Sequence, residues 1–370
     1  MKPSRTTLGR AAVLGTLALA LTACGSDPAV GPTGGPTADA EPGTAVSLSG
    51  TLVGAGASSQ ESAMQAWIAS FSAAHPDVTV TYDPVGSGGG RTQFADGATA
   101  FGGTDAALDD EEWAAAAARC APGEPTELPL YVSPIAVAFN LPGIDTLNMS
   151  ADTIARIFAG EITAWDDPEI AEANPGTALP SLAITPVNRS DESGTTQNFT
   201  EYLAAAAPDA WPHEPSGDWP VSGTQSAQGT SGVVQTVQAA EGAITYADAS
   251  KVGGLGTVAV QVGEEYVPYS PEAAAAVVDA SPLAPGRAET SLVRELERDT
   301  TASGVYPIVL VSYTIACTAY DDAATAALVK EFLAYVASEE GQQVAAQAAG
   351  SAPISDELRA EVLTIVDGIA

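Results

Sequence analysis

Basic residues are scarce in this chain of 370 residues, which has 13 lysines and arginines against 46 aspartates and glutamates and a formal net charge of -33. Nucleic acids and anionic membrane surfaces attract proteins through basic patches, so this balance argues against both as partners. Histidine is also scarce, with only His75 and His213, and no His/Cys group has the spacing of metal ligands. We therefore expect neither a metal site nor a cofactor.

The apolar run near the N-terminus is short. It covers residues 11–21, about half of the ~20 residues that a membrane-spanning helix needs, and three basic residues precede it, a pattern typical of a secretory signal. The run closes with Leu21-Thr22-Ala23-Cys24, which resembles the bacterial lipobox. That resemblance implies cleavage before Cys24 and attachment of lipid to it. The alternative is an ordinary signal peptide followed by a chance cysteine.

Only two further cysteines are present, Cys120 and Cys317. In an exported chain a leftover pair suggests one disulfide, with a single possible connectivity. Two separate buried thiols are the alternative.

Residues 25–45 consist mainly of glycine, proline, threonine and alanine and cannot form a core. We predict a lipoprotein signal peptide over 1–23, and the lipidated cysteine with a flexible tether over 24–45.

Aromatic residues make up only 6% of the chain, while hydrophobic residues reach 45% and are mostly alanine and valine, which favours a mixed helix and strand fold. Beyond the tether, strand-like and helical runs alternate: a strand over 47–56 precedes a helix over 58–75, a strand leads to a glycine-rich turn within 77–90, and strand, turn and helix recur over 98–120. This rhythm predicts α/β layers with sites at the C-terminal ends of strands.

Two long β-rich runs, 128–142 and 306–317, lie far apart in the sequence. We predict that they pair as crossings between two domains, with the second domain inserted between them. A helical stretch over 323–349 is then expected to return to the first domain.

Three glycine and hydroxyl turns stand where a strand gives way to a helix: 54–59, 86–90 and 193–196. The first N–H groups of a helix lack intrahelical acceptors and carry partial positive charge, so such turns can cradle an anion without any excess of basic residues. Each turn alone could be an ordinary N-cap. Arg189 precedes the third turn, and its planar fork suits a tetrahedral oxyanion, although a surface ion pair with Asp191 or Glu192 is the alternative.

The block Ile157–Leu203, "IFAGEITAWDDPEIAEANPGTALPSLAITPVNRSDESGTTQNFTEYL", closely resembles the phosphate-binding proteins of bacterial high-affinity phosphate ABC importers. The similarity continues through "GAGAS", "VGSGGG", "FGGTDAAL" and "GAITYADAS", and covers nearly all of residues 48–355. It implies a type II periplasmic-binding-protein fold: two α/β lobes joined by hinge strands around a ligand cleft. Lobe 1 would comprise 46–135 and 308–370, and lobe 2 would comprise 136–307.

The resemblance also implies a set of phosphate ligands: Ser58, Ser59, Ser87, Asp105, Arg189, Ser193, Gly194 and Thr195. Asp191 would orient Arg189 instead of touching the ligand. Two departures from the family stand out. Members often have threonine followed by an aromatic residue where this chain has Ser58-Ser59, and often have glycine where it has Glu192, a side chain that we expect to point to solvent.

Asp105 carries the argument for selectivity. A carboxylate repels a fully deprotonated dianion such as sulfate, whereas phosphate near neutral pH keeps a P–O–H group that can donate to it. Helix N-capping is the alternative role for Asp105.

The resulting prediction is a monomeric, lipid-anchored receptor on the extracytoplasmic face of the cell membrane. It binds inorganic phosphate, delivers it to the permease of an ABC importer and is not an enzyme. The alternatives are a receptor for another oxyanion such as sulfate, or a secreted phosphatase-type hydrolase. For the hydrolase, a catalytic triad would have to use one of the two histidines, which we expect to be exposed and which neighbour no G-x-S-x-G motif.

Overall fold

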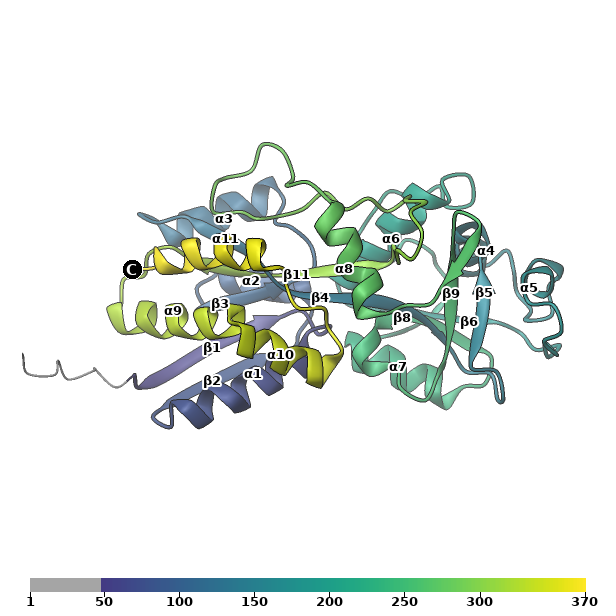
Figure 1. Ribbon diagram of the computed structural model, residues 1–370, viewed down its shortest axis with the longest axis horizontal. Coiled ribbons are helices and arrows are strands. Elements are labelled where there is room, and N and C mark those ends of the chain that lie inside the picture. The colour runs from purple at the N-terminus through teal and green to yellow at the C-terminus, as the bar shows by residue number, and fades with distance from the viewer. Residues whose placement is uncertain (1–47) are drawn as a thin grey trace, which may run out of the picture. The chain divides into compact units, whose positions relative to one another are not determined.

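A computed structural model of the chain describes residues 48–370, which form a mixed α/β fold around an eleven-stranded sheet (Figure 1). The predicted signal peptide, Cys24 and tether lie outside these residues. Eight strands are hydrogen-bonded neighbours in the order β2 (Val78–Asp83), β1 (Gly50–Gly56), β3 (Phe101–Thr104), β11 (Val309–Cys317), β4 (Pro125–Phe139), β8 (Ala243–Asp248), β6 (Thr185–Arg189) and β7 (Gln225–Ala227). The other three strands branch off: β9 (Gly256–Val262) pairs with β4, and β5 (Thr146–Met149) and β10 (Glu265–Val267) pair with β9.

Strands β4 and β11 form the centre of the fold, as the two longest β-rich runs predict. They pair antiparallel, and every residue of both strands is buried. Their sequences are therefore nearly continuous apolar runs and do not alternate between apolar and polar residues. Strand β4 pairs with β11 as far as Pro134, and from Ile135 onward it pairs with β8. One uninterrupted strand therefore belongs to both parts of the sheet.

We call the part built on β1, β2, β3, β11 and residues 125–134 of β4 the first half. Its helices are α1 (Glu61–Ala74), α2 (Ser87–Ala95), α3 (Asp110–Cys120), α9 (Ala323–Ala337), α10 (Glu339–Ala349) and α11 (Asp356–Asp367). Helices α9 and α10 come from the C-terminal end of the chain and pack against α1, as predicted for the helical stretch that follows the second long strand (Figure 1).

We call the part from Ile135 through α8 the second half. Its helices are α4 (Ala151–Phe158), α5 (Pro168–Ala173), α6 (Gly194–Ala206), α7 (Gly229–Ala239) and α8 (Pro271–Ala280), with a short 3₁₀ helix η1 (Ala249–Lys251) after β8. In both halves parallel strands lead into helices: β1 is parallel to β2 and β3, and β6 is parallel to β7 and β8. The C-terminal ends of these strands are where the predicted anion turns lie.

Residues 281–308 connect α8 to β11 and contact both halves. The Glu127 carboxylate of β4 is fully buried and accepts hydrogen bonds from Arg287 Nη1 at 2.9 Å and Ser291 Oγ at 2.6 Å. Further along the segment, Arg298 Nη2 donates to Glu201 of α6 at 2.9 Å. Buried polar groups need hydrogen-bond partners, so the contacts of Glu127 with Arg287 and Ser291 fix the path of this long connection.

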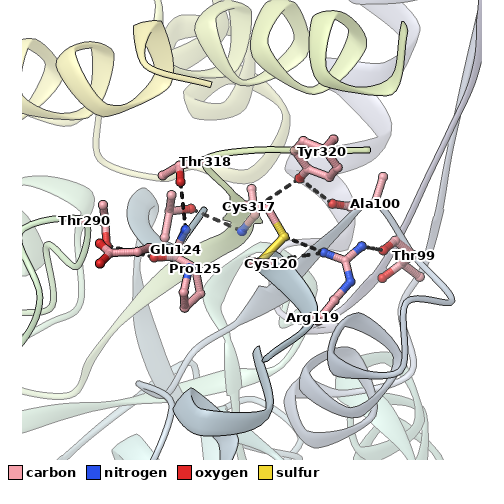
Figure 2. Close-up of a disulfide and its surroundings, with 12 residues drawn as sticks. Thr99, Ala100, Arg119, Cys120, Glu124, Pro125, Thr290, Cys317, Thr318 and Tyr320 are labelled. Carbon is pink, nitrogen blue, oxygen red and sulfur yellow. Dashed lines mark hydrogen bonds between the residues drawn. A yellow bond between two sulfur atoms is a disulfide. The ribbon is translucent and has the colours of Figure 1, made fainter. Parts of the chain in front are cut away.

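Cys120 and Cys317 form a disulfide, which confirms the predicted pairing and excludes two separate thiols (Figure 2). It joins the end of α3 to the end of β11 within the first half. Arg119 covers it: Nη1 lies 2.8 Å from Cys317 Sγ, and Nη2 donates to the carbonyl oxygen of Thr99 at 2.6 Å (Figure 2). The guanidinium also stacks over the Phe94 ring at 4.1 Å, which shields the sulfur atoms on that side.

The structure differs from the sequence-based predictions in three places. The glycines of 88–90 continue a helix that begins at Ser87, instead of forming a turn before it. The helical stretch 323–349 is two helices, because Ser338 ends α9 and its side chain caps α10 by accepting from the backbone N–H of Gly341. Helix α11 was not predicted at all.

Candidate functional site

Strand ends place the predicted ligands at the junction of the two halves. In the first half, β1 leads to Ser58 and Ser59, β2 leads to Ser87, and β3 leads to Asp105. In the second half, β6 ends at Arg189 and α6 begins at Gly194. Close backbone packing makes this arrangement possible: a Cβ on Gly56 would lie 2.0 Å from the carbonyl oxygen of Gly103.

The Asp105 carboxylate joins the two sides. It is 3% exposed and accepts hydrogen bonds from Ser59 Oγ at 2.7 and 2.9 Å and from Thr195 Oγ1 at 3.0 Å. Burial raises the pKa of Asp105, and the hydrogen bonds from Ser59 and Thr195 oppose that rise because they stabilise the ionised form. Asp105 does not cap a helix, since the N-cap of α3 is Asp109 in a capping box with Glu112, so that alternative is wrong.

Ser87 and Gly194 meet beside Asp105. The Ser87 hydroxyl accepts a hydrogen bond from the Asp105 backbone N–H at 3.1 Å. A Cβ on Gly194 would lie 2.6 Å from Ser87 Oγ and 2.7 Å from Asp105 Cβ. Only glycine at this position lets the N-terminus of α6 approach the first half so closely. Ser193 caps that helix by accepting from the Thr196 backbone N–H at 3.2 Å.

Arg189 forms a buried ion pair with Asp191. Its Nε donates to Asp191 Oδ1 at 2.8 Å and its Nη2 bonds to Oδ2, which gives the two-point geometry of a guanidinium with a carboxylate. Asp191 also accepts from the Gly229 backbone N–H at 3.0 Å. Burial alone would raise the pKa of Asp191, but Arg189 and this N–H outweigh it and lower the pKa. Asp191 therefore fixes the orientation of Arg189.

A fourth turn of the same kind was missed in the sequence. Gly229 and Thr230 begin α7, and the Ser58 hydroxyl lies 3.1 Å from both the backbone nitrogen and the hydroxyl oxygen of Thr230. The stretch "QGTSG" over 228–232 has the glycine and hydroxyl composition of the other three turns. Its preceding strand β7 has only three residues, so it leaves almost no strand pattern to mark the junction.

Glu192 and the histidines differ from expectation. Glu192 does not point freely to solvent: its side chain is 32% exposed and pairs with Arg91 of α2 at 2.9 Å. The histidines are partly buried, not exposed: His75 lies on the Phe71 ring at 4.4 Å, and His213 packs against Trp211. Within residues 48–370 neither imidazole hydrogen-bonds a serine of the site.

No group of three or more acidic, histidine or cysteine side chains in the described part of the chain is arranged to hold a metal ion. None of the helices between residues 48 and 370 combines the length and apolar character of a membrane span. The junction of the halves brings together hydroxyl groups, helix N-termini, the buried Asp105 carboxylate and the Arg189 guanidinium, a set that can hold a small protonated oxyanion by hydrogen bonds.

Comparisons with known proteins agree with this chemistry. Residues 32–340 match the family model of a PBP superfamily domain. The chain is 34% identical over 371 residues to the phosphate-binding protein PstS 3 of Mycobacterium tuberculosis, covering 97% of each. Its fold is similar to that of PfluDING, a high affinity periplasmic phosphate-binding protein solved with phosphate, at a TM-score of 0.69 and 20% identity, covering 85% of this chain and 93% of the other. A Clostridium perfringens protein assigned to a phosphate ABC transporter and holding phosphate has a TM-score of 0.58 at 20% identity, covering 81% and 98%.

Proposed function

The chain belongs to the phosphate-binding proteins of the PBP superfamily, and on this premise we propose that it binds inorganic phosphate between its two halves. The observation that carries the proposal is Asp105, a buried acceptor that contacts Ser59 of the first half and Thr195 of the second. The ligand is a phosphate that still carries a proton, because its P–O–H group donates to Asp105 while its other oxygens accept from the turns.

The remaining ligands divide by their chemistry. Arg189 bonds Asp191 through Nε and Nη2, so it would supply the positive charge and donate to the ligand through Nη1 and the second N–H of Nη2. Ser58, Ser87, Ser193, Gly194 and Thr195 contribute hydroxyl or backbone N–H groups at helix N-termini. Sulfate is rejected because it has no proton to give to Asp105, so an acceptor oxygen would face a buried carboxylate without a hydrogen bond.

The proposal extends to the biological setting. The chain serves as the substrate-binding receptor of a phosphate ABC importer, acts by binding instead of catalysis, and releases its ligand to the permease. The protein is a monomer on the extracytoplasmic face of the cell membrane, anchored by lipid on Cys24. Its first lobe comprises 46–135 and 308–370, and its second lobe comprises 136–307. Lobe motion about β4 would open and close a cleft between the halves, because this strand pairs with β11 of the first half as far as Pro134 and with β8 of the second half from Ile135 onward.

Calorimetry tests the binding proposal directly. The purified chain is freed of phosphate by partial unfolding and dialysis, then titrated with phosphate and afterwards with sulfate near pH 7. We expect one phosphate per chain, with micromolar affinity or tighter, and no heat from sulfate. Binding of sulfate would assign the chain to another oxyanion importer, and binding of neither anion would overturn the proposal.

A further inference from the structure

Glu192 and Arg91 form an ion pair across the cleft. Glu192 precedes α6 in the second half, and Arg91 lies in α2 of the first half. Glu192 Oε1 accepts from Arg91 Nη2 at 2.9 Å, and the Arg91 side chain is only 8% exposed. The arginine of the pair is therefore shielded from water, whereas the Glu192 side chain is 32% exposed, and solvent weakens the pair less than one with both partners on the surface.

The Glu192 side chain fills a slot between two glycines. A Cβ on Gly88 of the first half would lie 1.6 Å from Glu192 Oε2, and a Cβ on Gly217 of the second half would lie 2.2 Å from Oε1. Any side chain at either position would displace the carboxylate. Both halves thus leave room for Glu192 at the place where they meet.

Burial of Glu192 depends on its partner. Oε2 is buried and has no hydrogen-bond partner among the described residues, so the carboxylate relies on Arg91 to offset the loss of water. Arg91 itself is held by the first half: Nε donates to Glu112 at 2.7 Å and Nη1 donates to Thr104 Oγ1 at 2.9 Å. Thr104 directly precedes Asp105, so Arg91 has a fixed position next to the proposed ligand site.

We propose that Glu192 is a positioning residue for ligand release: its ion pair with Arg91 holds the two halves together and slows the departure of the bound phosphate. This inference rests on the proposed function. Separation of the halves would leave the Glu192 carboxylate without Arg91, so opening the cleft breaks the pair. The effect falls on the dissociation rate, because the pair forms only after the halves have met.

A second cross-cleft pair offers an internal comparison. Lys251 Nζ of η1 lies 3.0 Å from Glu61 Oε2 of α1, but both side chains are 23% exposed. Neither Lys251 nor Glu61 fills a glycine slot. The Glu192 side chain is itself 32% exposed, so the two pairs differ in the burial of the cation, 8% exposed for Arg91, and in the glycine slot that Glu192 fills. We therefore expect the Lys251–Glu61 pair to contribute less to closure than the Arg91–Glu192 pair.

Stopped-flow kinetics with the full chain test the proposal. Glu192→Gln keeps the shape of the side chain and removes its charge, and we expect phosphate to dissociate about tenfold faster while the association rate stays nearly the same. Glu161→Gln is the matched control, since Glu161 also pairs with an arginine, Arg156 at 3.0 Å, but within the second half. Its dissociation rate should stay within about twofold of the original.

A second variant separates the ion pair from a general loosening of the fold. In an Arg91→Gln background, Glu192→Gln should cause no further acceleration, because its partner is already gone. Equal acceleration with and without Arg91 would overturn the proposal, as would an unchanged rate in Glu192→Gln alone.

Hydrogen exchange provides a readout that needs no ligand. Backbone amides at the start of α6, from Gly194 to Thr196, should exchange faster in Glu192→Gln and not in Glu161→Gln. If the original chain binds no phosphate, the proposed function fails, and these amides still decide whether the pair holds the halves together. Equal exchange in all three proteins would overturn the inference independently of phosphate.

Discussion

The two sides of the cleft carry opposite chemistry. The first half contributes hydroxyl groups and the buried Asp105 carboxylate, and it contains the disulfide. The second half contributes the guanidinium of Arg189, oriented by Asp191. In the proposed site the acceptor Asp105 and the cation Arg189 thus come from different halves. If the proposal holds, selectivity depends mainly on the first half and electrostatic attraction mainly on the second.

Of the changes considered, removal of the Arg189 guanidinium from the second half should have the largest effect, a loss of phosphate affinity. We expect Arg189→Ala to weaken phosphate binding by about 2–5 kcal/mol, because it removes a buried charge partner of the anion and leaves Asp191 without its main counterion. Calorimetry measures the loss. Arg189→Lys is the control: it keeps the charge without the planar fork and should bind with intermediate affinity. Binding close to that of the original chain would remove Arg189 from the site.

The disulfide is expected to stabilise the first half more than the second. Replacing both Cys120 and Cys317 by serine should lower the free energy of unfolding by about 2–4 kcal/mol, since the bond closes a long loop with a sequence separation of 197. Denaturant unfolding gives this value. Hydrogen exchange should become faster in α3 and β11 before it does in α4. Equal changes in both halves would contradict the assignment of the effect to the first half.

Asp248 gives the second half its own pH dependence. It is fully buried at the end of β8, and the Tyr131 hydroxyl donates to both of its oxygens at 3.1 Å. Burial raises its pKa to about 6 against the opposing hydrogen bonds. A carboxyl whose pKa is raised in the folded state stabilises the fold below its unfolded pKa near 4 and loses that contribution as pH rises through 6.

The expected loss from this group between pH 4 and 7 is roughly 3 kcal/mol. Denaturant unfolding of the original chain and of Asp248→Asn across this range isolates it, since the difference between the two proteins cancels the other titrating groups. The free energy of unfolding should fall less steeply in the variant. Parallel pH curves would show that Asp248 titrates normally. Asp191 has a lowered pKa and works in the opposite direction, with its contribution lost on acidification.

Asp105→Asn tests the first side of the cleft with the smallest expected change. The amide NH2 group can donate to a fully deprotonated oxygen and the charge repulsion is removed, so the preference for phosphate over sulfate should shrink by about 1.5–3 kcal/mol. Paired titrations with the two anions measure this preference. Unchanged selectivity together with retained phosphate affinity would place the source of discrimination elsewhere.

Local patterns predicted the first half better than the second. The glycine and hydroxyl turns after β1 and β6 marked helix starts correctly, because a strand and a helix of ordinary length flank each one, whereas after β2 the helix begins at Ser87 and includes the glycines that were predicted as a turn. The same logic missed Thr230, since β7 is too short to show a strand pattern. It also missed α11 and left most elements of the second half undescribed. The residues that form a turn are adjacent in the sequence, so a local pattern can predict them. Short strands are stabilised by neighbouring strands that are distant in the sequence, so a local pattern does not predict them.

The position of Glu192 shows a different limit. Its slot exists only because Gly88 and Gly217, from opposite halves and distant in sequence, meet around it. The sequence pattern of an acid next to serine and glycine predicts a solvated side chain. No residue near Glu192 in the sequence indicates that it pairs with Arg91. Contacts of this kind arise from the three-dimensional arrangement of the halves, and a single sequence does not encode them in any local pattern.

The route of the chain also sets an order of assembly. The first half needs β11, α9 and α10, which lie near the C-terminal end of the sequence, whereas every strand that is confined to the second half lies before residue 268. During synthesis the second half is therefore complete while β3 still lacks its neighbour β11 and Cys120 still lacks Cys317. Pairing across so long a separation is slow, because loop-closure entropy must be overcome before the contacts form. We therefore expect the half that carries the disulfide to fold last, and the unpaired edge of β3 to be open to aggregation until β11 pairs with it.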